Sequence, residues 1–331
     1  MYEGWLFPFR HGSRVSAAER SRALGRDRPL PVSDNHGSLI RFNSTFLEMI
    51  DRRFRQRGMV LTCLAMLAVL VFLAAWVYLV VDSVASRDGA APPGFDGFFV
   101  FVTVVLAAGV GVVTWLVLAK DFFTFTHYPI RFDRRTRMVH AFFGAREGGV
   151  ASVPWDEAFF HVGRTGGADS GGEGGLCDIR CHVVDADGAI RRTFAVGHYF
   201  DEEAKVLAEW EFIRRYMEDG PEGVFEEPRV DPAVYGASLV VPTRRIDLSV
   251  VPSLRNCYDW VVMAMPQAWF GARLWLMPLY GPLALCRWSV MSSCRAPTWP
   301  RSVDPGAAPE PADPHRLPEP RVHAQWLTSD G

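Results

Sequence analysis

The chain has 331 residues and a formal net charge of −2 at pH 7, because its 35 Lys and Arg nearly balance its 37 Asp and Glu. This balance disfavours a globally basic nucleic-acid-binding protein. Hydrophobic residues make up 49% of the chain and charged residues 22%, which excludes a disordered polymer and indicates that the apolar residues are concentrated in particular segments. Six cysteines are too few for a disulfide-stabilised scaffold.

The N-terminal segment, residues 1–58, is polar and rich in arginine. Near its end, Thr45 and Glu48 have the spacing of a helix-capping box. Phe46, Ile50 and Phe54 would share one face of the helix that follows. We therefore predict a helix here that leads into the next segment.

Two long segments without a charged residue follow, at 59–81 and 98–119. About 20 apolar residues cross the hydrocarbon core of a bilayer, whereas a buried helix of a soluble protein is shorter and carries a polar face. We predict two transmembrane helices joined by a loop at 82–97. Because neither segment contains Asp, Glu, Lys, Arg or His, a transport pathway is disfavoured.

Arginine is concentrated on the outer flanks of these two segments. Eleven Arg precede the first, four lie between residues 131 and 137 after the second, and the loop holds only Arg87. The positive-inside rule then places both flanks in the cytoplasm and the loop outside. Gly109 and Gly111 give the second segment a small-residue patch, which predicts packing against the first segment or, as the alternative, a homodimer.

Residues 120–220 change to the alternating apolar and polar pattern of half-buried strands. The Asp187-Gly188 pair is typical of a hairpin turn. A helix is expected at 201–219, with acidic residues in its first turn and Gly220-Pro221 after its end. The predicted strands are 122–127, 130–133, 138–143, 150–154, 158–162, 176–185 and 190–196.

This order of elements predicts an α+β membrane protein. A two-helix transmembrane hairpin would be followed by a small antiparallel β-barrel or sandwich with one C-terminal helix as its cap. That soluble arrangement resembles pleckstrin-homology-like (PH-like) domains. After it we expect a linker at 221–256, a Trp- and Pro-rich membrane-interfacial or re-entrant segment at 257–296, and a disordered Pro-rich tail at 297–331. A third transmembrane span within 258–290 is the alternative, and it would send the tail outside.

Four stretches carry a family resemblance: Leu-Ile-Arg-Phe-Asn-Ser-Thr at 39–45, Pro-Ile-Arg-Phe-Asp at 129–133, Val-Pro-Trp-Asp-Glu at 153–157, and the Trp- and Pro-rich region 269–300. They resemble an uncharacterised bacterial family, the DUF6708 type. In a bacterium, the topology predicted above would make the chain a multi-pass protein of the inner membrane, with its N-terminus and main soluble domain in the cytoplasm. Members of that family are often encoded near type VI secretion effectors, which implies a role in interbacterial competition.

No catalytic, cofactor or metal site is predicted. Cys177 and Cys181 would lie about 13 Å apart on one strand, too far to share an ion, and His182 would point to the opposite face. The glycine-rich loop 163–175 lacks the ending of a phosphate-binding loop, so it is expected to be a flexible connection or, less favoured, a partner contact. We therefore expect a protein that is not an enzyme.

Two groups of residues are candidates for binding. Arg131, Arg134, Arg135 and Arg137 follow the second predicted span closely enough to contact anionic lipid, although they also satisfy the positive-inside rule without any ligand. Trp155 is expected to be an aromatic plug at one end of the β domain; as the alternative, Trp155 and Asp156 contact a partner.

These features predict a non-catalytic membrane protein. Its expected partners are the lipid bilayer and a protein, either an effector or a secretion component. An immunity protein against a membrane-acting effector is favoured. An adaptor that loads an effector for secretion and a PH-like sensor of membrane lipids are the alternatives.

Overall fold

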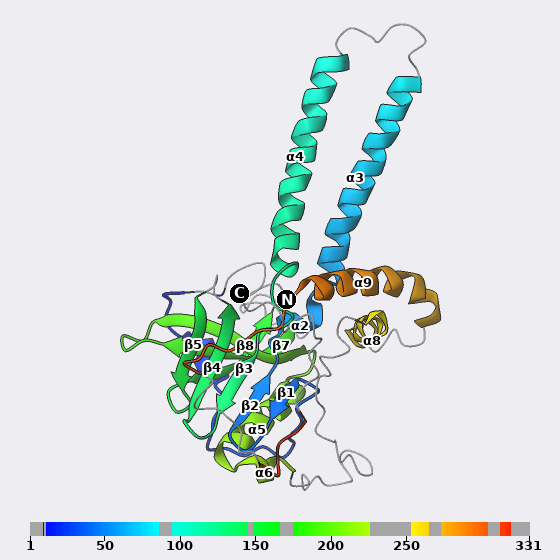
Figure 1. The fold of residues 1–331 in the computed structure, drawn as a ribbon. Helices are drawn as coiled ribbons and strands as arrows, with labels where there is room; N and C mark the ends of the chain where they lie inside the picture. The colour runs from blue at the N-terminus through cyan, green and yellow to red at the C-terminus, as the bar shows by residue number, and fades with distance from the viewer. Residues whose placement is uncertain are drawn as a thin grey trace. The chain divides into compact units, whose positions relative to one another are not determined.

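The computed structural model describes residue 9 and residues 11–85, 95–144, 148–165, 175–225, 253–264, 273–303 and 312–318. The chain divides into two compact units (Figure 1). Unit 1 comprises Met1–Arg55, Phe125–Val250 and Arg295–Gly331, and unit 2 comprises Gln56–Thr124 and Val251–Cys294. Each unit has its own hydrophobic core.

The larger sheet of unit 1 is antiparallel, and its strands pair in chain order. It contains β1 (Leu39–Phe42), β2 (Phe46–Met49), β3 (Ile130–Asp133), β4 (Met138–Gly144) and β5 (Gly149–Pro154). Two of these strands come from the segment before the apolar helices, so the sheet extends beyond the predicted 120–220 region.

The smaller sheet contains β6 (Phe159–Thr165), β7 (Leu176–Val184) and β8 (Ile190–Phe200), again antiparallel in chain order. The predicted hairpin at Asp187-Gly188 is confirmed, and Gly188 adopts a φ of 80° that favours glycine. Both sheets are open, because neither pairs its first strand with its last. Of the two predicted arrangements, a barrel or a sandwich, the barrel is therefore wrong, whereas the mixed α+β class with antiparallel sheets is confirmed. The glycine-rich loop lies mostly outside the described residues, at 166–174.

Helix α5 (Glu203–Glu218) completes the core of unit 1. Its residues Trp210, Ile213 and Met217 are buried among apolar side chains from both sheets. The chain leaves the helix through Gly220, which has a φ of 92°, and enters the short α6 (Pro221–Phe225). The predicted capping helix is thus confirmed.

The helix predicted around Thr45 is wrong, because this stretch forms the β1–β2 hairpin. Asn43 Oδ1 accepts hydrogen bonds from the backbone N–H groups of Thr45 and Phe46, both 2.8 Å long, and so closes the turn. Glu48 lies opposite Arg131 of β3 and does not cap a helix. A short helix, α2 (Arg53–Gln56), follows the hairpin.

Two other predictions about local structure need correction. Residues 122–127 form no named strand; Phe125 makes only an isolated bridge with Arg295. The tail expected to be disordered has described parts that pack on unit 1. There, Leu317 N–H donates to the carbonyl of Phe42 (3.0 Å), and the ring of Trp299 packs edge-on against Phe142.

Unit 2 is helical, and Figure 1 shows its helices α3 and α4 as long neighbours. Its core contains Met59, Val261, Tyr280, Leu283 and Ala284. The helices are α3 (Val60–Ala85), α4 (Phe95–Asp121), α8 (Leu254–Ala264) and α9 (Arg273–Ser293).

The buried carboxyl group of Glu209 should make the stability of unit 1 depend on pH. Glu209 is fully buried in α5 and accepts a hydrogen bond from Ser38 Oγ. Burial raises the pKa of Glu209 well above its usual range, although the Ser38 bond partly offsets this. The folded state therefore keeps a proton that the unfolded state releases above about pH 4.3. Stability is complete below that pH and falls by up to about 1.4 kcal/mol per pH unit until the folded pKa is passed.

Glu209→Gln removes this titration, so its urea midpoint at pH 7.5 should exceed that of the wild type, and the difference should shrink at pH 4. The matched control, Glu157→Gln, changes an exposed carboxylate and should follow the wild type at both pH values. A Glu209→Gln midpoint equal to wild type at pH 7.5 would contradict the prediction.

Candidate functional site

Helices α3 and α4 expose large apolar side chains along much of their length. Examples with more than half of their surface exposed are Leu70 and Tyr78 on α3 and Phe101 and Trp115 on α4. Within the described residues, one helix, Phe101–Asp121, is long and apolar enough to cross a membrane, with a mean hydropathy of 2.5. The apolar stretch of α3, Thr62–Tyr78, is shorter. By this measure the structure supports one span where the sequence predicted two.

Gly109 and Gly111 of α4 have open space beside them. A Cβ atom added at either would meet nothing within 4 Å among the described residues. Close packing against α3 is therefore not seen at these two glycines, and the homodimer stays a prediction.

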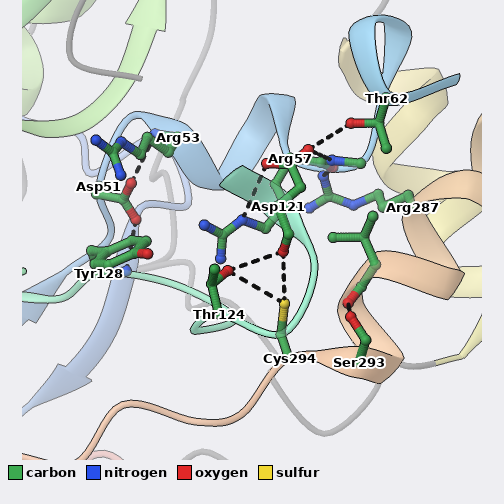
Figure 2. Close-up of polar contacts among 12 residues, drawn as sticks. Asp51, Arg53, Arg57, Thr62, Asp121, Thr124, Tyr128, Arg287, Ser293 and Cys294 are labelled. Atoms are coloured by element: carbon green, nitrogen blue, oxygen red, sulfur yellow. Dashed lines mark hydrogen bonds and ion pairs between the residues drawn. The ribbon is translucent and has the colours of Figure 1, made fainter. Parts of the chain in front are cut away.

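The end of α4 is held by Asp121, a fully buried residue of unit 2 (Figure 2). Its Oδ2 accepts hydrogen bonds from Gly58 N (3.0 Å) and Thr62 Oγ1 (2.6 Å), at the start of α3. Its backbone carbonyl accepts bonds from Thr124 Oγ1 (3.0 Å) and Cys294 Sγ (3.1 Å). One aspartate thus joins α3, α4 and the end of α9.

Two buried arginines lie beside this aspartate. Arg57 Nε is 3.9 Å from Asp121 Oδ1, and Arg287 Nη1 donates to the carbonyl of Arg57 (2.8 Å). Gly58 lets α9 come this close: a Cβ there would lie 2.7 Å from Arg287 Cα, and its φ of 65° favours glycine. The result is a charged cluster at the ends of apolar helices, which fixes their arrangement within unit 2.

In unit 1, Asp51 connects the chain before α3 with the chain after α4 (Figure 2). Its Oδ2 accepts a hydrogen bond from Arg53 N (2.9 Å) and its Oδ1 from Tyr128 N (2.8 Å). These bonds hold the chain just before α3 next to the chain just after α4.

The structure buries Arg131, one of the four predicted lipid contacts, and leaves it 1% exposed. Its guanidinium lies between the rings of Phe46 (4.4 Å) and Trp299 (4.7 Å). Its Nε and Nη2 contact Glu48 Oε1 at 2.8 and 2.7 Å. A lipid headgroup cannot reach this side chain, so the prediction is wrong for Arg131.

The other three arginines are at least partly exposed. Arg134 and Arg135 are exposed on the turn between β3 and β4. Arg137 donates two hydrogen bonds to Asp156 (2.9 and 2.6 Å) and contacts Glu218 at 3.2 Å. These bonds, those to Asp156 first, raise the pKa of Arg137, and the same contact lowers the pKa of Asp156. The structure thus brings Arg137 together with Asp156, whose side chain is 60% exposed.

Trp155 has no exposed surface, so the predicted aromatic plug is confirmed and the predicted partner contact at this residue is wrong. Its indole stacks on Trp210 of α5, with ring centroids 5.5 Å apart, and meets Phe132 edge-on. Its Nε1 donates to Glu218 Oε1 (2.6 Å).

Comparison with known families gives a match over residues 109–311 to the sequence model described as "Family of unknown function (DUF6708)". The match covers more than half of the chain. The chain belongs to this family. The DUF6708 match contains three of the four resembling stretches, at 129–133, 153–157 and 269–300, whereas the stretch at 39–45 precedes it. No match was found among curated proteins, and none among solved structures.

Several residues that organise this DUF6708 chain escaped sequence analysis. Asp121 and Arg287 stand at the edges of apolar stretches, which is a signal for a buried polar contact at a helix end. Glu48 was assigned to a cap because its spacing from Thr45 fits one. Nothing local to Trp299 predicts that its Nε1 donates to Glu48 Oε1 (2.8 Å), a contact between distant segments.

Proposed function

We propose that the chain is a membrane-anchored, non-catalytic protein in which α3 and α4 cross the bilayer as a hairpin and unit 1 binds a protein partner in the cytoplasm. The exposed apolar side chains of both helices support the anchor, because water would be an unfavourable environment for so much apolar surface. The helix Phe101–Asp121 is about 30 Å long at 1.5 Å per residue, which matches the hydrocarbon core.

The pairing of β2 with β3 is the main support for a transmembrane hairpin of α3 and α4. Phe46–Met49 and Ile130–Asp133 are hydrogen-bonded neighbours in one sheet, so both strands must lie on the same side of any membrane. The chain between them can therefore cross the bilayer only an even number of times. If α4 crosses, α3 must cross too, despite its shorter apolar stretch. The Asp51 bonds to Arg53 N and Tyr128 N support the same conclusion.

The same reasoning weighs against a third span at 258–290. The tail bonds to unit 1 through Leu317 N–H and Trp299 Nε1, so it lies on the side of the sheets. A single further crossing would put it on the other side. Helix α9 instead buries one face within unit 2, which favours a helix that lies at the interface over one that spans it. The buried residues of α9 are Tyr280, Leu283, Ala284, Cys286, Arg287, Val290 and Met291.

The proposed setting is the bacterial inner membrane, in a locus of interbacterial competition, where the protein would act as immunity protein against a membrane-acting effector. The resemblance to a family often encoded near type VI secretion effectors supports this setting. Deleting the gene should then make cells sensitive to the neighbouring effector, and a copy of the full chain should restore protection. Cells that stay resistant would refute immunity. Cells that stay resistant and no longer secrete the effector would support the adaptor function instead.

Anionic lipid contact is a separate proposal that now rests on Arg134 and Arg135. Both are exposed, and each could contribute about 1 kcal/mol near an anionic surface. The double variant Arg134→Glu with Arg135→Glu tests this lipid contact. If protection survives in it, the partner-binding role does not depend on lipid sensing of the PH-like type.

The topology gives a prediction that needs no knowledge of the partner. Reporter fusions after Arg57 and after Glu218 should both give a cytoplasmic signal, whereas a fusion within 82–97 should report the outside, since arginine is concentrated on the cytoplasmic flanks. A fusion at the exposed Asp187-Gly188 turn serves as a control and should match Glu218. An external signal at Glu218 would overturn the proposed topology.

A further inference from the structure

Two histidines lie against each other on the smaller sheet of unit 1. His161 of β6 and His182 of β7 have ring centroids 4.4 Å apart and are 2% and 5% exposed. The short helix α1 (Ala17–Ser21) brings Glu19 to the same place. One ligand atom from each of the three side chains lies within 4.8 Å of the other two.

Two of the three side chains are held in position by other bonds. His182 Nδ1 is 2.7 Å from Thr193 Oγ1, and its Nε2 is 3.4 Å from Glu19 Oε1. Glu19 Oε2 accepts the backbone N–H of Ser16 (2.7 Å) in a capping box, which leaves Oε1 facing His182. Such bonds orient a ligand and select the tautomer of a histidine.

The ring of His161 is buried, and its Nδ1 has no hydrogen-bond partner among the residues that the structure describes. An unsatisfied buried ring nitrogen is unfavourable, and a metal ion bound to the imidazole would satisfy it. The nearest charges on β7 are already paired, since Arg180 Nε bonds Asp178 Oδ1 at 2.9 Å.

We propose that Glu19, His161 and His182 bind a divalent transition metal ion of the zinc class. Two imidazoles and one carboxylate are a common set of three protein ligands for zinc, with a fourth position left open. Bonds of about 2.0–2.1 Å in a tetrahedron separate the ligand atoms by about 3.3 Å. Glu19 Oε1 and His182 Nε2 already have this spacing. The three ligand atoms lie within 4.8 Å of one another, so the side chains need to move closer to bind one ion. The Glu19 side chain is 29% exposed, which gives the ion a route from solvent.

The ion would pin the N-terminal segment to the sheet. Residues 12–24 already bond to the smaller sheet. Leu24 N–H donates to the Phe160 carbonyl (2.9 Å), and Val162 N–H donates to the Arg22 carbonyl (3.0 Å). A ligand from α1 and two from the sheet would make this attachment depend on metal. This site could not be predicted from local spacing, because Glu19 and His161 lie far from His182 in the chain and the nearest candidate ligands to His182 are cysteines.

The test uses the full chain in detergent, stripped with a chelator and then titrated with Zn²⁺ and Co²⁺. We expect one zinc ion retained per chain, a visible Co²⁺ spectrum without a thiolate band, and slower hydrogen exchange at Leu24 when metal is bound. Glu19→Gln, His161→Gln and His182→Gln should each weaken binding more than about 100-fold, and Thr193→Val about 10–100-fold. Glu19→Gln keeps a capping side chain at a partly exposed position, so it remains informative if a histidine variant does not fold.

His140→Gln is the matched control, because His140 bonds Ser152 on the other sheet and should leave binding unchanged. The proposal is overturned if the wild type retains no stoichiometric metal, or if the three ligand variants bind as the wild type does. A thiolate band in the Co²⁺ spectrum would also overturn it, since it would assign the ion to the cysteines.

Discussion

Trp155→Ala should lower the free energy of unfolding of unit 1 by about 3–5 kcal/mol, which is the usual cost of removing a large buried aromatic side chain. The indole has no exposed surface and packs against Phe132 and Trp210, so its loss leaves a cavity between a sheet and α5. It also leaves Glu218 without the Nε1 donor. Pulse proteolysis of the full chain in a urea series reports the unfolded fraction. An isolated 121–220 fragment would lack β1 and β2.

Two variants make this measurement specific. Trp155→Phe keeps an aromatic ring but loses the hydrogen bond, so it should cost about 1–2 kcal/mol. Trp115→Ala removes the same side chain from α4, where it is 72% exposed, and should leave unit 1 unchanged. If Trp155→Ala shows the wild-type midpoint, the indole is not buried in solution and the plug is refuted.

Arg131→Ala should destabilise unit 1 by about 3–5 kcal/mol, because removing one member of a buried ion pair leaves the other charge poorly compensated. Glu48 would keep the longer contact with Arg41 (3.5 Å) and the hydrogen bond from Trp299 Nε1. The guanidinium also fills the space between Phe46 and Trp299, so packing is lost together with charge. The same urea series measures the effect.

A double-mutant cycle distinguishes charge from packing. Glu48→Leu combined with Arg131→Met replaces the pair by apolar groups of similar size, and it should recover part of the loss, because buried pairs are often replaceable in this way. Arg135→Ala, at an exposed position on the turn that follows β3, should change stability by less than about 0.5 kcal/mol. A cost for Arg131→Ala as small as that of Arg135→Ala would contradict the burial of this side chain.

Much of unit 1 could be predicted because its elements have strong local signals. The Asp187-Gly188 turn and the α5 stripe around Trp210 depend on residues close in sequence, and both were found. The β1–β2 hairpin was missed because its turn depends on the Asn43 side chain, while Thr45 and Glu48 happen to have cap spacing. Barrel closure was overpredicted because a strand pattern shows which segments pair but not whether the first and last strands meet.

The sites were harder to predict, since they combine residues from distant segments. Arg131 was interpreted as a surface charge near a membrane, because its partner Glu48 is distant in sequence. Glu48 precedes the two apolar helices, whereas Arg131 follows them. The Glu19, His161 and His182 cluster similarly needs the N-terminal segment to run along β6. Periodicity within a window of residues cannot reveal such contacts.

The pairing of β2 with β3 also has a consequence for biosynthesis. The β1–β2 hairpin is made first, but its neighbour in the sheet follows roughly 80 residues later, after α3 and α4. At a translation rate of about 5–20 residues per second, the hairpin waits about 4–16 s at the ribosome. A two-stranded hairpin alone is barely stable, and its open edge invites other strands. If both helices insert into a membrane as proposed, the nascent chain depends on prompt insertion, and slow insertion should expose the unpaired hairpin to chaperones and proteases first.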